Sequence, residues 1–128
     1  GMVEAIQALH QRGVTTAIVT NKFESLGEKL TREMGLRDSF ACLIGGDTMG
    51  KGLAKPNRAP IDEMIRRCGG GRTAFVGDSI YDVQAAKNAG IPVVAVSFGF
   101  VTGRIEDLGA DAVIDHYAEL IPALESLA

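Results

Sequence analysis

The clearest chemical signal in the sequence is a pair of carboxylates that follows a short apolar run. Asp78 and Asp82 stand four residues apart, after residues 73–76 and Gly77, with Ser79 between them. Carboxylate oxygens at such a spacing suit Mg2+, which takes one or two protein carboxylates together with waters and substrate phosphate oxygens. The same residues also fit an ordinary helix start, with Asp78 or Ser79 as N-cap and Asp82 as a first-turn charge. The local pattern leaves both interpretations open.

Two other segments carry polar groups that suit a phosphate. Thr20 and Asn21 follow the apolar run 15–19, where a hydroxyl and the next backbone N–H groups would form a small anion cradle. Lys55 lies in the long irregular segment 45–60, and a lysine ammonium suits phosphate or carboxylate oxygens. Taken singly, the first segment is more often a helix-entry turn and the lysine more often a solvated loop residue.

Short apolar runs alternate with helix-like segments along the chain, which is the pattern of an α/β protein with a parallel sheet. Each run is nearly continuous in apolar character, as strands buried on both faces tend to be. The predicted strands cover residues 15–19, 41–44, 73–76, 93–96 and 112–114. The predicted buried faces of the helices comprise Ile6 and Leu9; Leu26, Leu30 and Met34; Ile61, Met64, Ile65 and Cys68; Ala85, Ala86 and Ala89; and Leu120, Ile121, Leu124 and Leu127. We therefore expect a Rossmann-like parallel sheet of about five strands flanked by helices.

The candidate residues converge on one edge of this sheet. In open α/β sheets a ligand binds outside the carboxyl ends of the strands, so the residues that follow strands are the candidates. Together they supply a hydroxyl, an amine and two carboxylates, from Thr20, Lys55, Asp78 and Asp82. This combination indicates a site for phosphate and a metal. His10 and His116 lack an acidic or nucleophilic neighbour in the pattern, and we interpret both as structural or solvated.

Composition narrows the class of protein. The chain has 128 residues, about one domain, with 46% apolar residues, 23% charged residues and a net charge of −3. Basic residues are scattered singly, which disfavours nucleic acid and membrane surfaces as partners, and no apolar run approaches the roughly 18 residues that span a bilayer. We therefore expect a cytoplasmic protein. Cys42 and Cys68 lack the spacing of a metal or redox motif and are expected to be small apolar side chains.

Three motifs of the chain resemble the second, third and fourth motifs of the haloacid dehalogenase (HAD) superfamily. They are, in order, Thr20-Asn21, Lys55-Pro56 and Gly77-Asp78-Ser79-Ile80-Tyr81-Asp82. Further segments are similar to those of its phosphoglycolate-phosphatase-like members, namely Gly1-Met2-Val3, Gly45-Gly46-Asp47-Thr48 and Gly99-Phe100. The resemblance runs along the whole chain and implies that residues 1–128 are part of a HAD-like catalytic core without a cap domain.

The resemblance implies a Mg2+-dependent phosphatase that hydrolyses small phosphomonoesters through an aspartyl-phosphate intermediate. Thr20 and Asn21 would hold the transferring phosphoryl group, and Lys55 would neutralise that group and the nucleophilic carboxylate. Asp78 would ligate Mg2+, Asp82 would ligate it or orient its waters, and Ser79 would support their loop.

The first motif of that superfamily, Asp-x-Asp-x-Thr, carries the nucleophile and occurs nowhere in residues 1–128. The resemblance places its strand at the centre of the sheet, between the strands predicted at 15–19 and 73–76. We therefore expect a truncated or proteolysed piece of the core that is inactive alone. Its sheet would be closed by direct pairing across the gap, by strand exchange in a homodimer, or by an N-terminal fragment.

Two other functions are open at this point. A non-catalytic module that keeps a phosphate-binding pocket for interaction would also lack the nucleophile. A receiver domain of two-component signalling uses similar residues, but there the acidic pair comes first and Lys-Pro last. In this chain Thr20 comes first and the acidic residues come last, which disfavours a receiver domain.

Overall fold

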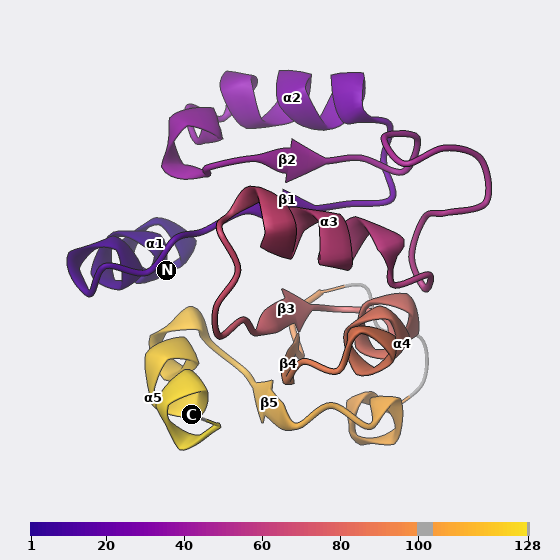
Figure 1. The fold of residues 1–128 in the computed structure, drawn as a ribbon. Coiled ribbons are helices and arrows are strands. Elements are labelled where there is room, and N and C mark those ends of the chain that lie inside the picture. Colours follow the sequence, from indigo (N-terminus) through magenta and orange to yellow (C-terminus); the bar gives the residue numbers. More distant parts are fainter. Residues whose placement is uncertain (100–103, 128) are drawn as a thin grey trace.

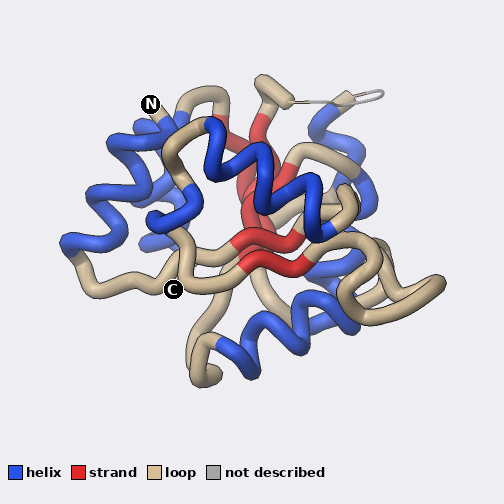
Figure 2. Tube along the Cα trace, turned by 90° about the horizontal axis from the view of Figure 1, so that it is seen from above, coloured by secondary structure: helices blue, strands red, loops and turns tan. Residues whose placement is uncertain are grey.

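The structure is a computed structural model that describes residues 1–99 and 104–127. Strands lie in the middle of the molecule and helices surround them (Figures 1 and 2). The strands are β1 (Ile18–Val19), β2 (Leu43–Ile44), β3 (Phe75–Gly77), β4 (Val93–Val96) and β5 (Ala112–Ile114). The α-helices are α1 (Met2–Gln11), α2 (Glu24–Glu33), α3 (Ala59–Arg67), α4 (Ile80–Ala89) and α5 (Leu120–Ser126). Short 3-10 helices are η1 (Arg37–Ser39), η2 (Ile105–Leu108) and η3 (Tyr117–Glu119).

The predicted α/β class with parallel strands is confirmed, and the strands divide into two sheets. β1 pairs with β2, while β3, β4 and β5 pair in that order. Figure 1 shows the β1–β2 ladder with α2 in its upper half and the other strands in its lower half. Direct pairing of β1 with β3, one of the expected ways to close the sheet, does not form in the described part of the chain. The division falls where the resemblance places the missing central strand.

The two strands that border this gap are less buried than the strands next to them. All residues of β4 and of β2 are buried. Both residues of β1 are only half-buried, and Val76 in the middle of β3 is 37% exposed. Strands inside a parallel sheet are normally buried on both faces. The facing edges of β1 and β3 are therefore incompletely covered.

The strand bounds agree with the sequence pattern for two of the five strands. β4 and β5 have the predicted bounds. β1 and β2 begin later than predicted, and β3 runs from Phe75 to Gly77 instead of over 73–76. The apolar runs are longer than the ladders, because apolar character marks burial whereas a strand also needs a hydrogen-bonded neighbour.

The predicted buried faces are confirmed for α1, α3, α4 and α5. Their most buried members are Ile6, Leu9, Ile61, Met64, Ala85, Ala86 and Leu120. The small side chains of α4 let this helix approach β3 and β4 closely. At its ends, α4 begins with a capping box at Ser79 and ends at Gly90, whose φ of 75° suits a glycine C-cap.

The prediction for α2 is wrong. Leu26, Leu30 and Met34 were expected to line its buried face, but they are 43%, 36% and 63% exposed. Gly27 is the buried residue of this helix, and a Cβ there would lie 3.2 Å from the Leu43 side chain. The helix thus packs on β2 through its glycine, which turns the apolar stripe outward. Helical periodicity identifies an apolar stripe but does not show which face a close helix–strand contact selects.

Candidate active site

The predicted site residues lie at the carboxyl ends of β1 and β3, on the two sides of the gap. Thr20 and Asn21 directly follow β1, and Asp78 directly follows β3. Asp82 belongs to the first turn of α4. Lys55 comes from the loop between β2 and α3 and reaches both β1 and α4 through hydrogen bonds.

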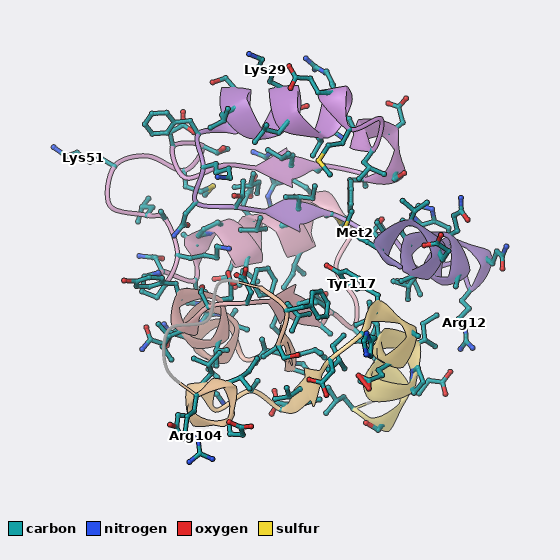
Figure 3. All side chains as sticks on the ribbon, turned by 180° about the vertical axis from the view of Figure 1, so that it is seen from behind. Met2, Arg12, Lys29, Lys51, Arg104 and Tyr117 are labelled. Carbon is teal, nitrogen blue, oxygen red and sulfur yellow. The ribbon has the colours of Figure 1, made fainter. Side chains whose placement is uncertain are left out.

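Lys55 connects the two sides of the gap. Its Nζ donates to Asp82 Oδ1 at 2.5 Å and to the Val19 carbonyl at 3.0 Å. The ammonium also lies 5.2 Å from the centroid of the Phe75 ring, within range of a cation–π contact. The Lys55 and Asp82 side chains are 9% and 8% exposed, so this ion pair is largely desolvated. By contrast, Lys51 in the same loop points away from the body of the molecule (Figure 3).

Asn21 holds the backbone at Lys55. Its Nδ2 donates to the Lys55 carbonyl at 3.1 Å, and its Oδ1 accepts the Lys55 N–H at 2.9 Å. The hydroxyl of Thr20 accepts the N–H of Lys22 at 3.2 Å and so shapes the turn after β1. The Asn21 side chain therefore positions the amine, a role that the residue pattern did not reveal. Its predicted phosphate contact stays a prediction, as does that of Thr20.

Asp82 closes the loop after β3 while it pairs with Lys55. Its Oδ2 accepts the backbone N–H of Asp78 at 3.0 Å and that of Ser79 at 3.2 Å. Ser79 Oγ in turn accepts the N–H of Asp82 at 3.3 Å, which completes the capping box. The helix-start interpretation is thus confirmed for Ser79 and Asp82. In addition, this capping carboxylate directs its second oxygen at the buried amine.

Two glycines make room for the acidic side chains. A Cβ on Gly77 would collide with the carboxylate of Asp82, and a Cβ on Gly99 would collide with that of Asp78. Gly99 lies in the segment after β4, so the Asp78 side chain sits against the ends of both β3 and β4. Phe100, which the resemblance coupled to Gly99, lies outside the described residues.

An aromatic pair borders the Asp78 side of the site. Tyr117 meets Phe98 edge to face, with ring centroids 4.8 Å apart and planes at 69°. Burial raises the pKa of the Tyr117 hydroxyl, and the negative charge of Asp78 raises it further. Figure 3 shows Tyr117 on the inner side of the molecule, near the start of α5. Neither aromatic residue was predicted as part of the site.

The loop after β2 is fixed to the turn after β1. Asp47 Oδ1 accepts the N–H of Glu24 at the start of α2, at 2.8 Å, and the Gly46 N–H donates to the Lys22 carbonyl at 2.7 Å. A Cβ on Gly45 or on Gly46 would collide with the backbone of that turn. The two glycines therefore allow the close approach that starts the loop toward Lys55.

A cavity of about 1020 Å³ fills the gap between β1 and β3. The strands contribute Ile18, Val19, Phe75 and Val76 to its wall. Apolar side chains from α1, α3 and α5 also line it, among them Leu9, Ile61, Met64, Leu120 and Leu124, and so do polar residues before β1 and β3 such as Thr15, Arg72 and Thr73. Lys55, Asp78 and Asp82 also line it, so the structure brings these three together. Thr20 and Asn21 are not among the described residues of its wall.

The donor set fits a magnesium site that takes further ligands from elsewhere. Among the described residues, no group of three or more His, Cys, Asp or Glu side chains could hold a metal ion. Mg2+ needs few protein ligands, because it keeps several waters and binds substrate phosphate oxygens. Asp78 and Asp82 supply the hard oxygen donors that such a site requires.

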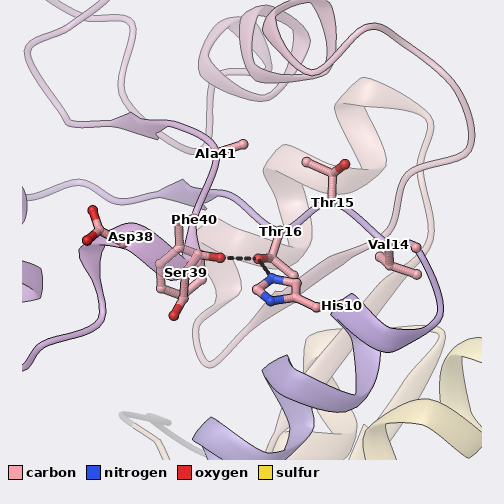
Figure 4. A pocket seen from close by; sticks show the side chains of 9 residues that line it. His10, Val14, Thr15, Thr16, Asp38, Ser39, Phe40 and Ala41 are labelled. Atoms are coloured by element: carbon pink, nitrogen blue, oxygen red, sulfur yellow. Dashed lines mark hydrogen bonds between the residues drawn. The ribbon is translucent and has the colours of Figure 1, made fainter.

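A smaller hollow of about 380 Å³ lies near the amino-terminal end of β1 (Figure 4). Thr16 Oγ1 donates to the Ser39 carbonyl at 2.8 Å. Its single proton is used there, so His10 Nε2, 2.9 Å away, is the donor to Thr16. His10 therefore ties α1 to the segment before β1, which confirms its structural interpretation.

Comparison with known proteins assigns the family. The family model of haloacid dehalogenase-like hydrolases matches residues 1–90 of the chain. The chain belongs to this family. The phosphoglycolate phosphatase of Agrobacterium fabrum is 41% identical to this HAD chain over 126 residues, covering 97% of the chain and 53% of the relative. That of Mesorhizobium japonicum is 40% identical over 122 residues, covering 94% of the chain and 53% of the relative.

A solved structure shows the same fold. The predicted phosphoglycolate phosphatase from Haemophilus somnus superposes with a TM-score of 0.86 at 28% identity, over 94% of this chain and 54% of that one. The HAD chain thus spans about half the length of the relatives it matches. The HAD resemblance drawn from three short motifs is confirmed, and the receiver-domain alternative is excluded.

The structure also bears on membrane-spanning helices and on the two cysteines. Within residues 1–99 and 104–127, no helix combines the length and apolar character needed to cross a membrane. Cys42 and Cys68 carry free thiols and are half-buried. Cys42 has a polar neighbour as well, because Arg67 Nη1 donates to its Sγ at 3.5 Å.

Proposed function

We propose that residues 1–128 supply the phosphate- and magnesium-binding part of a HAD-type phosphatase that hydrolyses small phosphomonoesters. The observation that carries the proposal is the desolvated Lys55–Asp82 pair beside Asp78, at the carboxyl ends of β1 and β3. Curated relatives described as phosphoglycolate phosphatases support a small phosphorylated carboxylic acid, phosphoglycolate, as the substrate.

Lys55 stabilises the negative charge of the transferring phosphoryl group and of the attacking carboxylate. Its side chain is only 9% exposed, and a fixed charge acts more strongly where water is excluded. Thr20 and Asn21 would donate to phosphoryl oxygens through the hydroxyl and a backbone N–H, because they lie between the end of β1 and the start of α2.

Mg2+ would be held by Asp78, while Asp82 would be a second ligand or orient the waters of the ion. When bound, the ion supplies positive charge to the phosphoryl oxygens. Asp82 accepts hydrogen bonds from Lys55 and from two backbone N–H groups, which fix the orientation of its carboxylate. Ser79 supports the loop through its bond with Asp82.

The attacking aspartate is proposed to come from polypeptide outside residues 1–128. Its carboxylate oxygen attacks phosphorus as the bond from phosphorus to the ester oxygen breaks, and the leaving alkoxide takes a proton from water to become the alcohol. A second water then hydrolyses the aspartyl phosphate to inorganic phosphate and the free aspartate. An N-terminal fragment would provide that polypeptide, whereas strand exchange in a homodimer would close the sheet without supplying the nucleophile. A cytoplasmic location without nucleic-acid or membrane partners stays part of the proposal, supported by the net charge of −3 and the scattered basic residues.

A non-catalytic phosphate-binding module is the second candidate, because the first HAD motif, which carries the nucleophile, does not occur in residues 1–128. A chimera separates the two: the Agrobacterium fabrum phosphatase with its matched segment replaced by residues 1–128. We expect the chimera, but not the chain alone, to hydrolyse p-nitrophenyl phosphate and phosphoglycolate, and only with Mg2+. Lys55→Met should lower kcat by about 10²–10³-fold, whereas the control Lys51→Met should not change it. A folded but inactive chimera would favour the module.

A further inference from the structure

The backbone at Lys55 and Pro56 is held from both sides of the gap. On the β1 side, Asn21 accepts the Lys55 N–H at 2.9 Å and donates to the Lys55 carbonyl at 3.1 Å. On the other side, Nδ2 of Asn88 donates to the Pro56 carbonyl at 3.1 Å. Asn88 lies in the last turn of α4, six residues after Asp82. Three backbone groups of this segment are therefore fixed by two asparagine side chains from different elements.

The amine of Lys55 is held by the same two elements as its backbone. The end of β1 supplies the Val19 carbonyl, 3.0 Å from Nζ, and the first turn of α4 supplies Asp82 Oδ1 at 2.5 Å. Helix α4 thus contacts the lysine segment at two points, with Asp82 at the amine and Asn88 at the backbone. Six residues of α-helix span about 9 Å. The lysine side chain is therefore framed by two contacts that belong to one helix.

The hydrogen bond from Asn88 contributes little to the stability of the fold. Its side chain is exposed, whereas the buried apolar residues of α4 are Val83, Ala85 and Ala86. Water competes for both groups of an exposed hydrogen bond, so the net stabilising effect is small. Asparagine is also a poorer helix former than alanine. What the hydrogen bond determines is where the Pro56 carbonyl lies.

A small shift of this backbone changes where the Lys55 amine lies. The lysine side chain joins its ammonium to the backbone through a flexible four-carbon stem. Fixing the backbone limits the positions from which Nζ can reach the Asp82 carboxylate, whose side chain is 8% exposed. A displacement of about 1 Å at a reacting group can cost about a hundredfold in rate. The position of the Lys55 backbone therefore controls how well its charge meets a phosphoryl group.

We infer that Asn88 is a positioning residue of the proposed phosphatase, which acts through the Pro56 carbonyl to set the position of the Lys55 amine relative to Asp82. The inference rests on the proposed function for its effect on the reaction, whereas its effect on the amine is measurable without any reaction. Asn88 lies outside the two motifs that contain Lys55 and Asp82. Because it acts through Lys55, its substitution should have no effect on the reaction where Lys55 is absent.

Hydrogen exchange of the Lys55 ammonium, followed by nitrogen-15 NMR in the 128-residue chain, measures the effect on the amine. These protons are hydrogen-bonded and largely excluded from water, so they should exchange slowly. Asn88→Ala should raise the exchange rate about fivefold, the factor that corresponds to one ordinary hydrogen bond. Gln84→Ala is the matched control, because Gln84 is an exposed amide one turn earlier on α4. It should change the rate by less than about twofold, and equal rates in the two variants would overturn the inference.

A double-mutant cycle in the chimera of residues 1–128 with the Agrobacterium fabrum phosphatase measures the effect on the reaction. Asn88→Ala should lower kcat for p-nitrophenyl phosphate about tenfold while Lys55 is present. In the Lys55→Met background it should lower kcat by less than about twofold, because the group that it positions is gone. Equal losses in the two backgrounds would show a structural role alone and would overturn the inference. A chimera without activity would refute only the proposed function, and the exchange rates would still decide the role of Asn88.

Discussion

Asp82→Asn is the substitution that most sharply tests the buried ion pair. Asparagine has nearly the same shape but no charge, and its single carbonyl oxygen can accept either from Lys55 or from the N–H groups of Asp78 and Ser79, but not from both sides. Lys55 would remain 9% exposed without a counter-charge. Breaking a buried pair by removing one partner costs about 3–5 kcal/mol, because the remaining charge is desolvated and uncompensated. We expect the free energy of unfolding of the 128-residue chain to fall by this amount.

Urea unfolding followed by circular dichroism gives the measurement. Asp62→Asn is the matched control, because Asp62 pairs with Arg58 at 2.7 Å while both side chains are about half exposed, at 42% and 56%. Such an exposed pair contributes at most about 1 kcal/mol. Adding Lys55→Met to Asp82→Asn should recover part of the loss, since no lone charge is then left buried. Equal destabilisation by Asp82→Asn and Asp62→Asn would refute the desolvated ion pair.

Three further predictions follow from individual contacts. Hydrogen bonds from Arg66 and Arg67 lower the pKa of Glu63 from 4.5 to about 2. The stabilisation of the fold by these bonds is therefore complete above about pH 4.5 and is lost as the pH falls through about 2. A carbon-13 NMR titration of Glu63 with a midpoint near 4.5 would contradict this. Gly99→Ala should displace the Asp78 carboxylate and raise the Mg2+ concentration that half-activates the chimera, and an unchanged value would contradict the close approach. Asn21→Ala removes two hydrogen bonds to the Lys55 backbone and should destabilise the chain by about 1–3 kcal/mol in urea unfolding, whereas no change would show that they do not hold the loop.

The sequence predicted where all five strands lie and the bounds of β4 and β5, because buried parallel strands are nearly continuous apolar runs. It also predicted that Lys55, Asp78 and Asp82 lie together, since residues after parallel strands meet at one edge. It failed at the apolar stripe of α2, because the contact between Gly27 and β2 depends on how closely two elements approach. Periodicity carries no information about that distance.

The contacts that tune the site were not readable from the sequence. Asn21 and Lys55 are 34 residues apart, and their paired backbone hydrogen bonds appear only in the folded chain. Gly99 likewise has no local signal, because the group that requires its lack of a Cβ is the distant Asp78 carboxylate. The gap was expected only through the family resemblance, since no residue within the chain marks a missing neighbour.

The central claim is that a phosphate and a magnesium ion share the edge where Lys55, Asp78 and Asp82 meet. Paramagnetic broadening by Mn2+, used in place of Mg2+ with inorganic phosphate on the isotope-labelled chimera, tests it most directly. We predict that the amide signals of Asp78, Ser79 and Gly99 broaden first, and that Asp78→Asn abolishes this selectivity. Broadening that centres on other residues, or that survives Asp78→Asn unchanged, would contradict the account.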